Sequence, residues 1–498
     1  MRRILLGFLV FLSACGADTD SDPRYVRIAI SSNPKSLDPA LTTDVNGGDI
    51  AAKIFNGLVK FDGAGIAPDL ADTWTVSPDG LEYRFHIRES VRFQNGRELV
   101  PEDVVRSFDR LMDTATQSQR RWVFDSVDRY YAEGTNVVIR LKRPCAPFLT
   151  LLAMPSGYIV PVEESAKHGQ DFSHHVIGTG PFKLVRWEDD RSVVLERNTD
   201  YFEGAPAVHG IIYRILTEPL TQLALLKSGS LDICEIPDAQ MPAFLADENW
   251  RDRIQSVDQI VVGYVAINTE RYTDSRVRAA FNMAVDRGRI IEKVRNGLGT
   301  PANGPVPPAL ASRRAVGYEY NPAAARKLLE EAGFDFSRRL TILRNAPRGT
   351  LEPAEAVAGY LRDIGVRVIV EPMEFSSLIA RLNRADYDLC LWNWFADYSD
   401  PENFLLPLFH SRNVGSSGNR SRIVDTGIDA SIERVMSLAA GPERDSAVEA
   451  ADRLIVAHAP WIFLWYPRTA MAVSPRVSGY TLPMIYNGFK GNSLVLAR

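Results

Sequence analysis

Hydrophobic and polar residues follow two different patterns along this chain of 498 residues. In the first half, short segments such as "LEYRFHI" (81–87) alternate apolar and polar residues, which is the period-2 pattern of a half-buried strand. The segment "PEDVVRSFDRLMD" (101–113) is amphipathic, and its leading proline suits the first turn of a helix. The region from about 24 to 260 is therefore predicted to be rich in strands.

From about residue 265, predicted helices and strands alternate. The segment 275–294 carries apolar residues on one helical face, with Ser275 as the expected N-cap. The helix "NPAAARKLLEEAGF" (321–334) has a capping asparagine before it and a glycine near its end. Further strands are predicted at 340–344, 366–370 and 387–394, and further helices at about 353–364 and 375–383. This order predicts a largely parallel α/β sheet.

Acidic and aromatic residues gather beyond the last of these strands. "WNWFADYSDPENF" (392–404) places Asp397 and Asp400 after the strand, and Arg344 lies at the carboxyl end of the strand 340–344. Ligands of open α/β sheets bind outside the carboxyl ends of the strands. A carboxylate beside aromatic rings suits an ammonium group, and an arginine suits a carboxylate. The pattern therefore favours a zwitterionic ligand such as a short peptide.

Two other interpretations of the same residues stay open. In the structural one, Asp397 caps the following turn and Arg344 is a solvated strand end. In the enzymatic one, Asp397 and Asp400 are the paired carboxylates of a glycoside hydrolase. The sequence contains none of the motifs G-x-x-x-x-G-K-[ST], H-E-x-x-H and G-x-S-x-G. Neighbouring residues point apart on regular elements, so the pair His174-His175 does not suggest a metal site, and we expect no cofactor.

The N-terminus has the features of an export signal. "MRRILLGFLVFLSAC" (1–15) has two arginines, an apolar run and small residues, and it is too short for a mature membrane span. "LSAC" resembles a bacterial lipobox, in which Cys15 is acylated and becomes the new N-terminus; the alternative is an ordinary signal peptide with a chance cysteine. Residues 16–23 then form a flexible tether. We expect a periplasmic or extracytoplasmic protein anchored to a membrane by lipid.

Composition narrows the class of protein. The chain is 45% hydrophobic and 24% charged, with a net charge of -5. About 150 residues per domain gives roughly three globular domains. Acids and bases are interleaved, which argues against binding to nucleic acid. After removal of the signal, Cys145, Cys234 and Cys390 remain, and an oxidising compartment would allow one disulfide among them without fixing the pairing.

A long segment then adds a family resemblance. "PDLADTWTVSPDGLEYRFHIRESVRFQNGRELVPEDVVRSFDRL" (68–111) closely resembles the signature of the extracellular solute-binding protein family 5, the peptide- and nickel-type binding components of ABC importers. Other segments follow in family order. They are "SLDPA" (36–40), "GTGPFKLVRW" (178–187), "LERNTDYFEGAP" (195–206), "SGSLDI" (228–233), "VRAAFNMAVDR" (277–287), "ARKLLEEAGF" (325–334) and "HAPWIFLWY" (458–466). The resemblance covers nearly the whole mature chain.

The resemblance implies an α/β fold of the periplasmic binding protein type, with two lobes, an extra inserted domain and a ligand cleft between the lobes. It implies a monomeric binding protein, not an enzyme, that delivers short peptides to the permease of an ABC importer. The implied domains are domain I (24–55, 180–264 and 474–498), the inserted domain II (56–179) and domain III (265–473).

The resemblance also assigns roles to residues. In peptide-binding members, the aspartate of a "W-x-x-D" motif holds the peptide α-amino group, and the matching residue is Asp397, with Trp392, Trp394 and Tyr398 around it. Of the two tryptophans, we expect one to face the cleft and the other the core. Asp400 then belongs to the turn that follows.

An arginine at the end of an earlier strand binds the ligand carboxylate in dipeptide binders, and its place falls on Arg344. The family pattern "R-P-Y-N-P" is replaced by "RNAPRG", so Arg348 competes for this role. This departure leaves open a ligand longer than a dipeptide, a sugar, a metal chelate or another solute, and Asp397 favours ligands that carry an amine. A secreted hydrolase and a structural lipoprotein without a ligand are the remaining alternatives.

Overall fold

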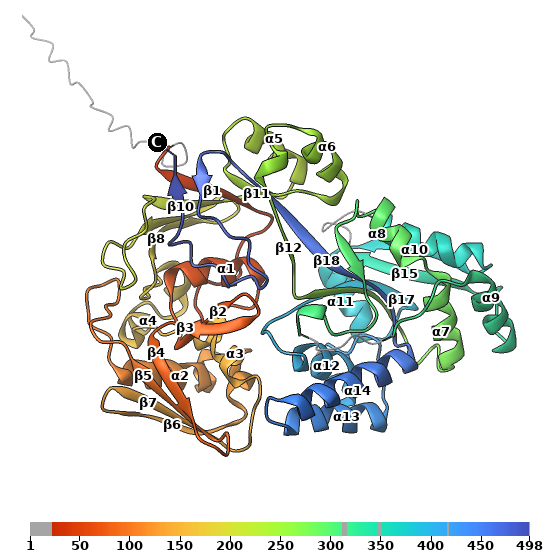
Figure 1. Cartoon of the computed structure of the whole chain (residues 1–498), viewed down its shortest axis with the longest axis horizontal. Coiled ribbons are helices and arrows are strands. Elements are labelled where there is room, and N and C mark those ends of the chain that lie inside the picture. Colours follow the sequence, from red (N-terminus) through yellow and green to blue (C-terminus); the bar gives the residue numbers. More distant parts are fainter. Residues whose placement is uncertain (1–21, 311–315, 346–350, 416–417, 498) are drawn as a thin grey trace, which may run out of the picture.

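A mixed sheet of twelve strands runs through both lobes of the protein in the computed structural model (Figure 1). The structure describes residues 22–310, 316–345, 351–415 and 418–497. The strand order along the main path is β16-β15-β17-β13-β18-β11-β1-β10-β9-β8. The N-terminal lobe supplies β1 (Tyr25–Ile30), β8 (Phe182–Glu188), β9 (Ser192–Arg197), β10 (Gly210–Ile215) and β11 (Ile233–Glu235). The C-terminal lobe supplies β13 (Val261–Ile267), β15 (Arg339–Asn345), β16 (Arg367–Met373) and β17 (Leu389–Phe395).

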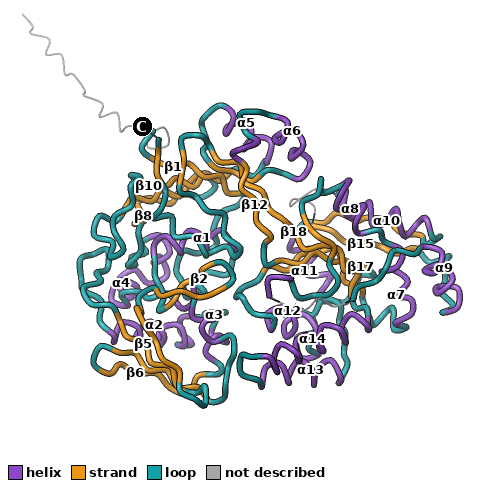
Figure 2. Tube along the Cα trace, in the orientation of Figure 1, coloured by secondary structure: helices purple, strands orange, loops and turns teal. Residues whose placement is uncertain are grey.

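The long strand β18 (Trp461–Val473) joins the two lobes. Near its start, Trp461 is paired with Ala266 of β13, and at its end Val473 is paired with Ile233 of β11. The strands β12 (Ile254–Asp258) and β14 (Gly299–Pro301) pair with β18 as well. Figure 2 shows β12 and β18 crossing from one lobe to the other. The predicted boundary at residue 473 coincides with the end of this shared strand, and the domain boundaries stay a prediction.

The N-terminal lobe contains a second, antiparallel sheet. Its order is β4 (Ala71–Val76), β5 (Glu82–Ile87), β7 (Asn136–Leu141) and β6 (Val127–Glu133). The helix α2 (Pro101–Met112) packs on β6 and β7, and its first turn is closed by Asp103, whose carboxylate accepts from the Val100 N–H at 2.9 Å. The remaining elements of this lobe are α1 (Val45–Ile54), β2 (Val59–Asp62), β3 (Gly65–Pro68), α3 (Phe148–Leu152), α4 (Val162–His168), α5 (Pro219–Lys227) and α6 (Met241–Ala246). The strand predicted at 81–87 and the helix predicted at 101–113 are confirmed.

The C-terminal lobe has the predicted alternation of helices and strands. Its helices are α7 (Ser275–Ala284), α8 (Arg287–Lys293), α9 (Pro322–Glu331), α10 (Glu352–Asp363), α11 (Phe375–Asn383), α12 (Glu402–Phe409), α13 (Thr426–Ser437) and α14 (Pro442–His458). The strands β15, β16 and β17 are parallel, but β13 pairs antiparallel with both β17 and β18. The predicted parallel arrangement is confirmed for these three strands, and the wider sheet is mixed because β13 and β18 pair antiparallel.

The single helix predicted over 275–294 is wrong. The chain leaves the helix at Val285, and Asp286 begins a second helix by accepting from the N–H of Arg289 at 2.9 Å. The cap of the first helix is Asp274, whose carboxylate accepts from the Arg276 N–H at 2.8 Å, and not Ser275. Aspartate side chains readily accept hydrogen bonds from the unpaired N–H groups at the start of a helix, and Asp274 and Asp286 each do so here.

The disulfide that the sequence allowed is not formed, because Cys145, Cys234 and Cys390 are all free thiols. Burial raises the pKa of each of them to about 12, so all three stay protonated at neutral pH. Buried protonated cysteines behave as small apolar side chains. These thiols therefore contribute to packing.

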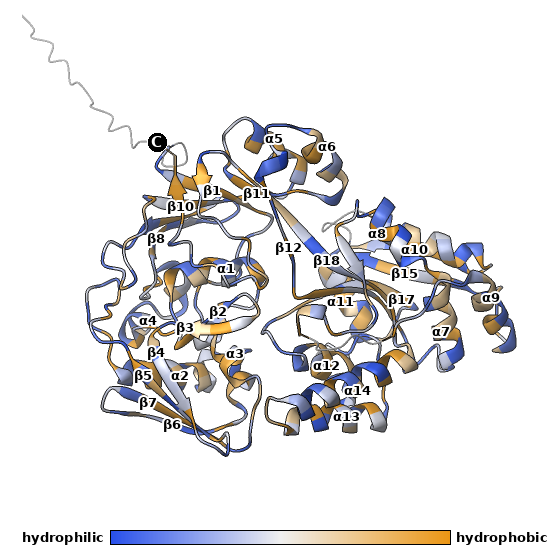
Figure 3. Ribbon diagram, viewed as in Figure 1, coloured by the Kyte–Doolittle hydropathy of each residue, from blue (hydrophilic) through white to orange (hydrophobic). Residues whose placement is uncertain are grey.

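The largest hydrophobic cluster extends across both lobes. It includes Phe61 and Phe148 from the N-terminal lobe and Tyr398 and Phe404 from the C-terminal lobe. Hydrophilic residues colour the outer turns of helices such as α9 and α14 (Figure 3). The segment after β18 returns to the N-terminal lobe, where β19 (Val477–Ser478) pairs with β20 (Val495–Leu496). Among the described residues, no helix is long and apolar enough to cross a membrane.

Candidate functional site

Asp397 lies where the two lobes meet. It follows β17 of the C-terminal lobe, and its Oδ1 accepts from Nη2 of Arg120 at 2.9 Å. Arg120 belongs to the N-terminal lobe, just before the short helix η3 (Arg121–Phe124). The Asp397 side chain is 26% exposed and that of Arg120 is 12% exposed. The predicted acid therefore meets a cation, but that cation comes from the opposite lobe.

Asn403 fixes the backbone at Asp397. Its buried side-chain oxygen accepts from the Asp397 N–H at 3.0 Å and from Nε1 of Trp394 at 3.2 Å. Asn403 lies in the first turn of α12, so one amide ties this helix to the end of β17. The Asp397 carboxylate is thereby positioned through its main chain, and its own oxygens are left for other partners.

Trp392 and Trp394 lie on the same face of β17. They are separated by one residue, and side chains two apart on a strand share a face. Their partners on β13, Tyr264 and Val262, belong to the hydrophobic cluster that spans the lobes, and both tryptophans pack against it. The expectation that one tryptophan faces the cleft and the other the core is therefore wrong.

Aromatic rings from three parts of the chain surround the ion pair. Tyr398 is 3% exposed, and its ring lies 5.9 Å from that of Trp122 across the two lobes. Tyr486 lies in the segment after β18; burial and the charge of Asp397 raise its pKa above the ordinary value. A Cβ at Gly48 would lie only 2.2 Å from Cε2 of Tyr486. The lack of a side chain at Gly48 of α1 therefore leaves room for the Tyr486 ring.

Asp400 has a different environment from Asp397. Its carboxylate accepts from Nη1 and Nη2 of Arg444 at 3.0 and 2.7 Å, and both side chains are buried. It also accepts from the Glu402 N–H at 2.8 Å, at the start of α12. Burial and the charge of Asp400 raise the pKa of Glu402 to about 7. Asp400 therefore stabilises the turn between β17 and α12, where the sequence prediction placed it, and its carboxylate is occupied by Arg444 and the Glu402 N–H.

Arg344 lies near the carboxyl end of β15, at the predicted edge of the sheet. β15 pairs with β17 at Leu343 and Cys390, so Arg344 is level with Leu391, six residues before Asp397. At about 3.3 Å per residue, this is at most roughly 20 Å along the strand direction. Burial lowers the pKa of the Arg344 guanidinium. Its competitor Arg348 lies outside the described residues.

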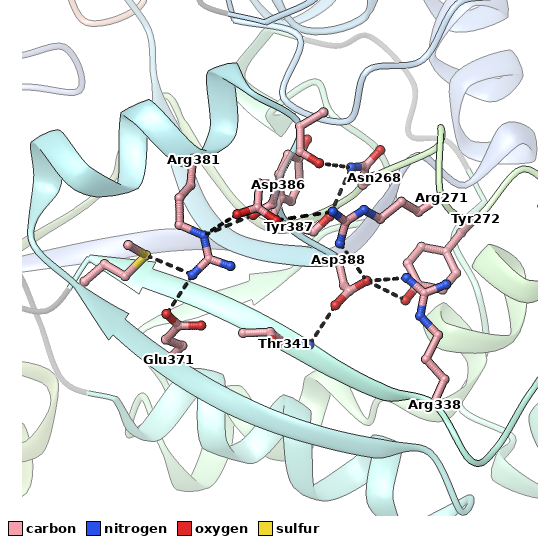
Figure 4. Close-up of polar contacts among 12 residues, drawn as sticks. Asn268, Arg271, Tyr272, Arg338, Thr341, Glu371, Arg381, Asp386, Tyr387 and Asp388 are labelled. Atoms are coloured by element: carbon pink, nitrogen blue, oxygen red, sulfur yellow. Dashed lines mark hydrogen bonds and ion pairs between the residues drawn. The ribbon is translucent and has the colours of Figure 1, made fainter.

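A second charged cluster lies at the opposite edge of the same sheet, before the start of β17 (Figure 4). The Asp388 carboxylate accepts from the hydroxyl of Tyr272 at 3.0 Å, from Nη2 of Arg338 at 2.9 Å and from the Thr341 N–H at 3.1 Å. Arg271 adds a longer contact of 3.4 Å. These bonds connect the ends of β13, β15 and β17, so this cluster stabilises the sheet that carries Asp397.

Two further features bear on the chemistry. Among the residues that the structure describes, no group of three or more His, Cys, Asp or Glu side chains is arranged to hold a metal ion. A pocket of about 470 Å³ in the C-terminal lobe is lined by residues of the segments 285–288, 301–303 and 316–320, and none of the predicted site residues is among them.

Sequence reasoning missed Arg120, Asn403 and Tyr486. Asn403 stands in the quoted motif "DPENF", where its place in the first turn of a helix was a usable signal. Arg120 is 277 residues away from Asp397 in the sequence, and no periodicity connects them.

The model of the bacterial extracellular solute-binding proteins, family 5, matches residues 65–416 of the chain. The chain belongs to this family. The resemblance of the segment 68–111 is thereby confirmed, and members of the family are the solute-binding components of transporters.

Curated relatives of this family-5 protein are named for different ligands. The di/tripeptide-binding protein 2 of Pseudomonas aeruginosa is 29% identical, with 97% of each chain covered. The heme-binding protein A of Haemophilus influenzae is also 29% identical, over 93% of this chain and 90% of the relative. A solved periplasmic binding protein of Helicobacter pylori, DppA with the peptide STSA, has a TM-score of 0.83 at 24% identity, over 95% of this chain and 98% of that one. This likeness confirms the predicted two-lobed α/β fold.

Proposed function

We propose that this family-5 protein captures short peptides between its lobes and delivers them to the permease of an ABC importer. The observation that carries the proposal is the Asp397 carboxylate, held at the junction of the lobes by the amide of Asn403. The name of the Pseudomonas aeruginosa relative, which matches along almost the whole chain, supports peptides as the ligand class.

The chemistry of the site favours an amine as the anchored group. An ionised carboxylate between partly buried rings attracts a cation, and an ammonium group forms charge-assisted hydrogen bonds with it. Trp122, Tyr398 and Tyr486 supply the rings, whose faces add a cation–π contribution. A neutral sugar would gain neither term.

The opposite end of the ligand is assigned to Arg344. The register of β15 and β17 puts this arginine upstream of Asp397 along the same edge, so a peptide that contacts both lies extended along it. A guanidinium binds a carboxylate through two parallel hydrogen bonds, which suits the carboxyl end of such a peptide.

The identity of the natural ligand is tested by native mass spectrometry of the protein purified from its host. We expect complexes whose extra mass, after release and fragmentation, reads as peptides of a few residues with free amino ends. Heme, a sugar or a metal chelate in their place would overturn the peptide assignment and keep only the transport role.

We also propose that Cys15 is lipidated and tethers the protein to the membrane. Residues 1–21 lie outside the described residues, so this rests on the lipobox in the sequence. Cys15→Ser is expected to leave an unprocessed or released protein, because serine cannot form the thioether. Fractionation and labelling with a fatty-acid analogue measure this. Equal membrane retention and labelling of the variant would contradict it.

A further inference from the structure

The ion pair between Arg120 and Asp397 joins the lobes at the point where the proposed ligand amine binds. Both partners are held by their main chains. The Arg120 N–H donates to the hydroxyl of Ser118 at 3.1 Å, and that buried hydroxyl donates to the Ala40 carbonyl at 2.5 Å. Asp397 is held on its side by Asn403. The backbone is therefore fixed at both residues of the ion pair.

The pair is partly shielded from water, with side-chain exposures of 12% for Arg120 and 26% for Asp397. Burial lowers the pKa of Arg120, but the charge of Asp397 and the nearby Tyr486 more than offset this, so the guanidinium has a pKa above its ordinary value. A charge pair with this little exposure is screened weakly by salt.

Other contacts also join the two lobes next to this ion pair. The hydroxyl of Ser399, two residues after Asp397, donates to the Ala64 carbonyl of the N-terminal lobe at 2.6 Å. Trp122 lies two residues after Arg120 and reaches the ring of Tyr398. The ion pair is therefore one of several direct contacts between the two lobes at this point.

We propose that Arg120 is a latch: its guanidinium takes the place of the ligand amine on Asp397 and holds the lobes together in a form that does not admit ligand. This inference rests on the proposed function, because it assigns Asp397 as the amine anchor. Arg120 donates to Oδ1 of the same carboxylate that the ammonium needs, so the two cations compete. Binding then requires that the ligand ammonium displace Arg120.

A latch of this kind lowers the observed affinity in a defined way. If only the unlatched fraction binds, the apparent dissociation constant is the intrinsic one divided by that fraction. An ion pair that keeps about nine molecules in ten latched lowers affinity about tenfold, which corresponds to about 1.4 kcal/mol. Removing the guanidinium should therefore strengthen the binding of an amine ligand, although it deletes a charged residue of the site.

The test compares the wild-type protein with Arg120→Gln. With no peptide added, small-angle scattering should give a larger radius of gyration for the variant, because the lobes lose their charge pair. Trialanine, titrated by calorimetry, should bind the variant about tenfold more tightly, and saturation should bring both proteins to the same compact dimension. Arg120→Lys keeps a positive charge with a different side-chain geometry. Its affinity for trialanine and its radius of gyration should lie between those of the wild type and of Arg120→Gln.

The matched control is Arg129→Gln, which removes an equal charge from an exposed position on β6 of the same lobe. It should behave as the wild type. Equal or weaker binding of trialanine by Arg120→Gln, or an unchanged radius of gyration, would overturn the latch. If no di- or tripeptide binds either protein, the proposed function fails, while the scattering comparison without ligand still decides whether Arg120 holds the lobes together.

Discussion

Replacing Asp397 by asparagine is expected to lower the affinity for a peptide with a free amino end by about 30-fold to several-thousand-fold. Removing one member of a desolvated charge pair costs roughly 2 to 5 kcal/mol, because the remaining charge stays buried without its partner. Asparagine has almost the same shape, and the backbone N–H at this position still bonds to Asn403. The substitution therefore removes the charge and leaves the local fold in place.

Calorimetric titration with the peptide that co-purifies, together with thermal unfolding of both proteins, checks this result. The unfolding temperature should change little, since the Asp397 side chain is the more exposed partner of its pair. A structural role for Asp397 would reverse the outcome: the variant would unfold at a lower temperature and bind the peptide with normal affinity.

Replacing Asp400 by asparagine is expected to lower the free energy of unfolding by about 3 to 5 kcal/mol. The bidentate pair with Arg444 is almost fully buried, with side-chain exposures of 10% and 6%. Breaking such a pair leaves a guanidinium without its counter-charge in the interior, which is strongly destabilising. The pair connects the start of α12 to α14, so its loss is expected to lower the stability of this part of the C-terminal lobe.

Urea unfolding measures this loss of stability. The matched control is a substitution on α14, the helix that carries Arg444. Glu449→Gln removes the partner of Arg453, an ion pair whose arginine is 56% exposed. Such a surface pair contributes roughly 0 to 1 kcal/mol, so the control should unfold near the wild-type midpoint. Equal stability of the Asp400 and Glu449 variants would show that the buried pair does not hold the turn. Peptide affinity of the folded Asp400 variant should stay within a few-fold of wild type.

The sequence predicted the elements of the C-terminal lobe closely because their signals are local. Asn321 caps its helix through the Ala324 N–H at 2.9 Å, as its position before a proline indicated. The helix 375–383 and the end of β17 also follow from hydrophobic periodicity within a few residues. Since β15 and β17 are parallel, the same pattern placed Arg344 and Asp397 at one edge of the sheet.

Long-range contacts could not be predicted in this way. Arg120 meets Asp397 only because the joint between the lobes brings an N-terminal loop to the end of β17, and no residue near Arg120 signals this. The tryptophans are a different case: two residues on one strand share a face, so the opposite placement of Trp392 and Trp394 was an error of periodicity. The broken helix at Val285 shows that a capping aspartate inside an apolar pattern outweighs the pattern.

The central claim, that Asp397 binds the amino end of a peptide, is tested most directly by a thermodynamic cycle. The co-purifying peptide and its N-acetylated form are titrated into the wild-type protein and into Asp397→Asn. If the carboxylate and the ammonium contact each other, acetylation and substitution each weaken binding strongly, and both together cost little more than either alone. Additive losses, or full affinity of the wild-type protein for the acetylated peptide, would contradict the account.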